Sequence, residues 1–106
     1  MIWVKFETRK NEFVSMEVTG HAGYDEYGKD IVCAAVSAIT GGALNAIDIM
    51  ETNSCELIDE ENRTYVKVLN NSEKLQAILE TVYHQLNTIA VSYGDYLRVE
   101  RTEVKS

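Results

Sequence analysis

Several residue types are scarce in this chain of 106 residues, which has no proline, two cysteines, two histidines and one tryptophan. Cys33 and Cys55 can form one disulfide at most, whereas small secreted disulfide scaffolds carry four or more cysteines. We therefore expect a reducing compartment and a cytoplasmic protein. The absence of proline excludes no function.

Basic residues are also few, because 10 lysines and arginines stand against 17 aspartates and glutamates, for a formal net charge of −7. A nucleic-acid interface needs clustered basic side chains that displace counterions, and no such cluster occurs in the sequence. We therefore expect no direct binding to DNA or RNA, and a partner that is neutral or basic.

The chain has no long apolar run of the kind that crosses a membrane. Its longest uncharged stretch, residues 31–47, contains Ser37, Thr40 and two glycines, and falls short of the roughly 18–20 residues that span a bilayer. Residues 2–7 alternate between apolar and polar side chains instead of forming the apolar core of a signal peptide. We expect neither a signal peptide nor membrane binding.

Motifs for metals and nucleotides are missing as well. Zinc sites and redox dithiols use closely spaced pairs such as C-x-x-C, and the sequence has none. The six glycines form neither a P-loop nor a dinucleotide fingerprint. We expect no metal and no cofactor.

The composition itself is that of an ordinary folded domain. Apolar residues make up 45% and charged residues 25% of the chain, close to the averages of globular proteins. A chain of this length suits one domain, so residues 1–106 are interpreted as a single unit.

Periodicity predicts an α+β fold. Apolar and polar residues alternate at 2–7 and again at Val14, Met16 and Val18, which predicts a hairpin with these residues facing inward. Residues 20–30 hold three glycines and predict a loop, and two helices are expected at 31–50 and 73–92. Three further strands are expected at 55–59, 65–69 and 96–101. The order ββαββαβ indicates two layers, with both helices on a mainly antiparallel five-stranded sheet.

The helix expected at 31–50 is almost uncharged, although a single sheet covers only one of its sides. Exposed apolar surface usually marks an interface, which favours a homodimer formed through the small residues of this helix. Those residues are Ala34, Ala35, Ala38, Gly41 and Gly42. The alternative is a monomer in which the second helix and the loops cover that surface.

Cys33 has two interpretations. A cysteine within an apolar run is often only a small buried side chain. If Asp30 caps the helix, however, Cys33 lies in its first turn, where unpaired amides and the helix dipole favour a thiolate. The same amides could receive the oxyanion of an acyl-transfer transition state.

A nucleophilic cysteine needs a base and a group that orients the base. His21 lies twelve residues before Cys33, where the second strand meets the glycine-rich loop. Asp30 could orient His21, or it could act only as a helix cap. Cys55 and His84 have no comparable neighbours and are interpreted as structural.

The residues around this pair resemble a known signature. The tripeptide Gly20-His21-Ala22, Gly28 after five intervening residues, and then the run from Asp30 to Ser37 closely resemble the signature of Prp, a family of ribosomal-processing cysteine proteases in Firmicutes and related bacteria. The signature covers about a sixth of the chain, and the length and element order also agree with the family.

This resemblance implies a function and a set of roles. Family members remove an N-terminal extension from the large-subunit ribosomal protein twenty-seven, act as dimers, and cover the cleft with the loop after the second strand. By this likeness Cys33 is the nucleophile, His21 the general base and acid, and Asp30 supports them. The residues expected to contact substrate are Gly20, Tyr24, Tyr27, Gly28 and Ser37.

Some of these side chains could have a purely structural role. Tyr24 and Tyr27 could simply pack within the loop, and Ser37 could bond only its own backbone. Two functions are therefore carried forward. The first is a cysteine endopeptidase that cleaves a ribosomal protein, and the second is a non-catalytic module that binds a peptide or assists ribosome assembly.

Overall fold

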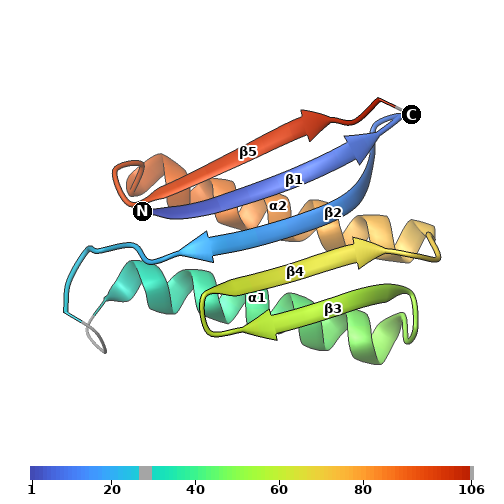
Figure 1. The fold of residues 1–106 in the computed structure, drawn as a ribbon, viewed down its shortest axis with the longest axis horizontal. Helices are drawn as coiled ribbons and strands as arrows, with labels where there is room; N and C mark the ends of the chain where they lie inside the picture. The colour runs from blue at the N-terminus through green and yellow to red at the C-terminus, as the bar shows by residue number, and fades with distance from the viewer. Residues whose placement is uncertain (27–29, 106) are drawn as a thin grey trace.

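The computed structural model describes residues 1–26 and 30–105, and shows two helices lying along one face of a five-stranded sheet (Figure 1). The elements follow the order ββαββαβ, which confirms the predicted two-layer α+β fold. They are β1 (Ile2–Arg9), β2 (Glu12–Gly20), α1 (Ile31–Met50), β3 (Cys55–Glu60), β4 (Arg63–Val68), α2 (Glu73–Ser92) and β5 (Leu97–Glu103).

The strands lie in the order β3-β4-β2-β1-β5. Three of the four neighbouring pairs are antiparallel, and β1 with β5 is parallel. β2 is the central strand, and β5 lies at the edge beside β1. The chain passes from β4 through α2 to reach β5, because a strand that joins the sheet in parallel needs a crossover connection rather than a tight turn.

The β1–β2 hairpin contains a register shift that the sequence pattern did not reveal. Its turn residues Lys10 and Asn11 have φ of 52° and 65°, values typical of a tight two-residue turn. Between Ser15 and Phe13, Val14 has no partner on β1, so a bulge changes which side chains face inward. The prediction of Val14 as an inward residue was therefore wrong, and Phe13 is buried in its place.

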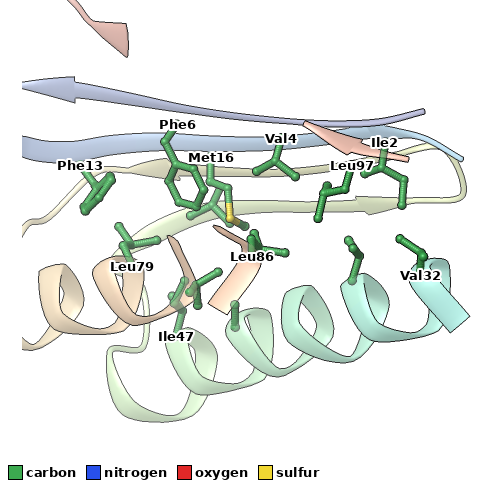
Figure 2. Packing of buried hydrophobic residues seen from close by; sticks show 14 of the residues in the cluster. Ile2, Val4, Phe6, Phe13, Met16, Val32, Ile47, Leu79, Leu86 and Leu97 are labelled. Carbon is green, nitrogen blue, oxygen red and sulfur yellow. The ribbon is translucent and has the colours of Figure 1, made fainter. Parts of the chain in front are cut away.

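The core lies between the sheet and the helices. Ile2, Val4 and Phe6 of β1 point toward the helical layer beside Met16 of β2 and Leu97 of β5 (Figure 2). Each helix contributes apolar side chains at three- and four-residue spacing, so one stripe of each helix packs against the sheet. The buried residues are Val32, Val36, Thr40, Ala43 and Ile47 of α1, and Leu75, Leu79, Val82 and Leu86 of α2.

Much of α1 stays uncovered. The stretch at 31–47 was expected to be too short to cross a membrane, but the complete helix is long and apolar enough by length and composition alone, with a mean hydropathy of 1.5. Its buried stripe nevertheless packs against the sheet. Only 28% of its most apolar 18-residue window is buried. Ile49 is 77% exposed and Met50 50% exposed, so this helix presents an apolar face to the outside of the domain.

Candidate active site

Three segments meet at one end of the sheet. They are the end of β2, the first turn of α1 and the turn between β3 and β4 (Figure 1). A cleft of about 620 Å³ lies among them. Five of the predicted site residues line it, namely Gly20, His21, Asp30, Cys33 and Ser37.

Gly20 ends β2 in a backbone conformation that suits glycine. Its φ is +87°, and a Cβ atom at this position would collide with the carbonyl oxygen of Met1. The backbone of His21 lies against the same terminal residue, because its carbonyl oxygen accepts a hydrogen bond from the Met1 amino group at 2.5 Å. These contacts fix the direction in which the chain leaves β2.

Asp30 caps α1. Its Oδ1 accepts hydrogen bonds from the amides of Val32 and Cys33, both at 3.0 Å, and its Oδ2 accepts one from Tyr24 at 3.0 Å. Within residues 1–26 and 30–105, no hydrogen bond joins Asp30 to His21. The structure therefore supports the cap rather than an orienting role toward His21.

The environment of Asp30 favours its ionised form. Burial raises the pKa of this carboxyl, but the amide hydrogen bonds from Cys33, Tyr24 and Asp25 and a side-chain hydrogen bond with Cys33 together hold it below its ordinary value. The Asp30 carboxylate ties the loop before α1 to the first turn of the helix.

Cys33 is half-buried and faces the cleft. Its Sγ accepts a hydrogen bond from the Ala22 amide at 3.3 Å, so a backbone dipole points at the sulfur. The amides of the first turn of α1 donate to Asp30 rather than to the sulfur. Val32 and Cys33 donate to the Asp30 side chain, and Ala34 donates to the Asp30 carbonyl at 3.0 Å. This differs from the expectation that first-turn amides stand open to an oxyanion.

His21 also lines the cleft and is exposed. Its Nε2 is 2.8 Å from Oδ1 of Asn62 in the β3–β4 turn. No hydrogen bond joins His21 to Cys33 in the described part of the chain. No sequence motif includes Asn62, which is 41 residues from His21 and reaches it only through the pairing of β2 with β4.

Tyr24, one of the two tyrosines expected to contact substrate, packs against other aromatic rings. Tyr24 meets Tyr93 and Tyr96 edge to face, with ring centroids 5.6 Å and 5.0 Å away. It is not among the residues that line the cleft, which favours loop packing over substrate contact. Tyr27 and Gly28 lie outside the described residues.

The other cysteine and histidine lie elsewhere. Cys55 begins β3 next to Ser54, and burial raises the pKa of its thiol. His84 is exposed on α2, where its Nε2 is 3.8 Å from a carboxylate oxygen of Glu80. Neither residue lines the cleft.

The profile of one protein family, described as cysteine protease Prp, matches residues 1–98. The chain belongs to the Prp family of cysteine proteases. Relatives named ribosomal processing cysteine protease Prp include one from Bacillus subtilis, 36% identical over 93 residues that cover 81% of this chain and 83% of the relative. Another, from Staphylococcus aureus, is 34% identical over 83 residues, covering 76% and 78%.

Solved structures of Prp agree with the fold. Prp from S. aureus with a covalently linked product peptide has a TM-score of 0.88 and 30% identity, covering 95% of this chain and 99% of its own. The same protease with a substrate peptide has a TM-score of 0.82 and 29% identity, with the same coverage. These likenesses confirm a cysteine protease and do not support the non-catalytic module.

Proposed function

We propose that this protease removes the N-terminal extension of the large-subunit ribosomal protein twenty-seven in the cytoplasm, with Cys33 as nucleophile and His21 as general base and acid. The observation that supports the proposal most directly is that both side chains line the same cleft, His21 at the end of β2 and Cys33 at the start of α1. The Prp relatives named as ribosomal processing proteases support the choice of substrate.

The reaction is that of a Cys–His pair. His21 takes the thiol proton of Cys33, and Sγ attacks the scissile carbonyl carbon to form a tetrahedral intermediate. When the C–N bond breaks, His21 gives the proton to the departing amine and an acyl thioester remains on Cys33. Water, deprotonated by His21, then attacks the thioester, releases the acid product and returns the proton to Sγ.

Two dipoles stabilise the sulfur anion. The Ala22 amide donates to Sγ, and the first turn of α1 places the positive end of the helix dipole beside it. Asp30 holds the loop and the start of α1 together, because one of its oxygens accepts from the Tyr24 amide and the other from the Cys33 amide. We assign it the role of support to the nucleophile rather than of partner to the base.

The charge of the cleft suits a neutral or basic peptide. Asp25 and Glu61 line it together with Arg63, but the Arg63 guanidinium is paired with Glu17 at 2.7 Å. Gly20 and Ser37 also line the cleft, and we retain both as substrate contacts. A peptide with lysine or arginine near the scissile bond is therefore favoured over an acidic one.

Cleavage of a peptide that carries the extension tests this proposal. We expect the unmodified protein to cut it at one bond, and Cys33→Ala to bind it without cutting. Cys55→Ala serves as the matched control and should cut at the rate of the unmodified protein. Failure of the folded, reduced protein to cut this peptide would contradict the choice of substrate.

We also propose a homodimer formed through the outer face of α1. Ala34, Ala38 and Gly42 are exposed there, and an apolar groove of about 520 Å³ runs between α1 and α2. A second copy that packed its own α1 along this groove would cover that apolar surface.

Sedimentation tests the dimer. We expect the unmodified protein to sediment as a dimer at micromolar concentration and Ala38→Glu as a folded monomer, because a carboxylate would be buried at the interface. A monomer for the unmodified protein would contradict the proposal. Lys105→Glu, a charge change far from α1, is the control.

A further inference from the structure

We propose that Asn62 positions His21 for proton transfer, by accepting a hydrogen bond from its Nε2. The inference rests on the proposed function, in which His21 is the base of the protease. It begins from one contact, the 2.8 Å separation between His21 Nε2 and Asn62 Oδ1. Both residues line the cleft that contains Cys33.

The sheet brings Asn62 to this place. β2 and β4 run antiparallel with Thr19 opposite Arg63, so the next residue outward on each strand places Asn62 across from Gly20 and beside His21. The β3–β4 hairpin closes at the pair of Glu60 with Arg63, which makes Asn62 part of its two-residue turn. Asn62 therefore reaches the base from the turn that joins β3 and β4 at one end of the sheet.

Arg63 anchors this turn to β2. Its Nε donates to Oε2 of Glu17 at 2.7 Å, and its guanidinium lies 4.6 Å from the centre of the Tyr65 ring. Arg63 therefore connects the turn to β2 through Glu17 and to β4 through Tyr65. Asn62, immediately before Arg63, is held where His21 leaves β2.

The contact decides which imidazole nitrogen is basic. An amide oxygen can only accept a hydrogen bond, so Nε2 of His21 carries the proton and Nδ1 keeps the lone pair that can take the proton of Cys33. The contact also persists in the imidazolium form, because Nε2 keeps its proton throughout the reaction. Cys–His–Asn arrangements serve papain-like proteases on an unrelated fold.

Asp30 does not supply this function. Its two oxygens are engaged by the amides of Val32, Cys33, Tyr24 and Asp25. Among the described residues, Asn62 is the group that is hydrogen-bonded to the His21 ring. We therefore infer that the nucleophile and the base have separate supports, Asp30 for Cys33 and Asn62 for His21.

Nitrogen-15 NMR of the imidazole rings tests the contact without relying on catalysis. The chain has two histidines, so His84 serves as an internal reference. In the unmodified protein we expect His21 to show the Nε2–H tautomer, and Asn62→Ala to give a mixture of tautomers. Asn62→Asp keeps an oxygen acceptor and should keep the Nε2–H tautomer. An unchanged His21 tautomer in Asn62→Ala would overturn the inference.

Peptide cleavage tests the positioning role. We expect Asn62→Ala to lower kcat by about 10- to 100-fold with KM little changed, since a misplaced base affects the chemical step. Asn62→Asp should recover most of the activity. Asn70→Ala is the matched control, because it removes an exposed turn amide that donates to the Asn53 carbonyl.

The outcomes separate this inference from the proposed function. If the unmodified protein cuts the peptide and Asn62→Ala cuts it equally fast, the inference is wrong while the protease assignment stands. If the unmodified protein does not cut the peptide, the substrate assignment fails, and the tautomer measurement still decides whether Asn62 sets the state of His21.

Discussion

Cys33 and Cys55 show how position distinguishes two chemically identical side chains. Both are half-buried free thiols, but Cys33 faces a cleft and accepts the Ala22 amide, whereas Cys55 sits at the start of β3 beside Ser54. The two thiols differ in access to the cleft, in the nearby backbone dipole, and in the burial that raises the pKa of the Cys55 thiol.

Alkylation measures this difference. At neutral pH we expect iodoacetamide to modify Cys33 faster than Cys55, because burial raises the pKa of Cys55 and leaves it with less thiolate. Peptide mapping of the alkylated protein over time gives both rates. Equal and slow modification of the two thiols would contradict the assignment of Cys33 as nucleophile.

The ionisation of Asp30 makes the stability of the fold depend on pH. Its pKa is lower in the folded protein than its ordinary value of 3.8, so its ionised form stabilises the fold at neutral pH. That contribution is present above the ordinary value and is lost as the pH falls through the lower, folded value. We expect Asp30→Ala to have a lower Tm than the unmodified protein at pH 7.

Thermal unfolding of both proteins across acidic pH checks the sign. The difference in Tm between Asp30→Ala and the unmodified protein should shrink once the pH falls below 3.8. Asp95→Ala, a loop substitution away from α1, is the control and should show no such trend. A difference that stays constant down to strongly acidic pH would contradict the account of Asp30 as an ionised cap.

At the scale of elements, the two helix caps explain why both helices begin where the sequence indicates. Asp30 and Ser72 each bind amides of the first turn, and the helices that follow start at Ile31 and Glu73 as expected. Ser72 also bonds the Glu51 carboxylate, so the cap of α2 is tied to the end of α1.

Ser72 provides a stability prediction. We expect Ser72→Ala to lower the free energy of unfolding by about 1 kcal/mol, because the Leu75 amide loses its acceptor. Ser92→Ala, at the exposed far end of α2, is the control and should change stability little. Chemical denaturation of the three proteins gives the values, and equal stabilities would show that this cap contributes nothing.

Strand details were less predictable than helices. The alternation of Val14, Met16 and Val18 indicated the wrong inward residue at one position, because a bulge cannot be recognised from alternation alone. The strand expected at 65–69 begins two residues earlier in the structure, because Arg63 and Thr64 pair with β2. Cross-strand pairing, which sets both features, depends on segments distant in sequence.

At the scale of the whole molecule, the sheet assembles a site from pieces that the sequence separates. The signature residues from Gly20 to Ser37 are local, so His21, Asp30 and Cys33 could be named from the chain alone. Asn62 could not, because only the antiparallel pairing of β2 with β4 brings it to His21. The role of Asp30 was open for a related reason, since only the structure shows which groups its oxygens bind.

The two-layer arrangement buries apolar side chains between the helices and the sheet, and this burial stabilises the fold. Leu79 of α2 is fully buried against the sheet (Figure 2). We expect Leu79→Ala to lower the free energy of unfolding by about 2–5 kcal/mol, through lost apolar burial and the cavity left behind. Denaturant unfolding gives the value, and Val91→Ala, an exposed position of the same helix, is the control.

The most direct test of the account is to trap the acyl-enzyme. The reduced protein is mixed with the extension peptide, quenched in acid within the first turnover, and analysed by intact mass and peptide mapping. We predict a thioester on Cys33 that carries the N-terminal part of the peptide, present also in Cys55→Ala and absent from Cys33→Ala. Cleavage without an adduct on Cys33, or an adduct on Cys55, would contradict the account.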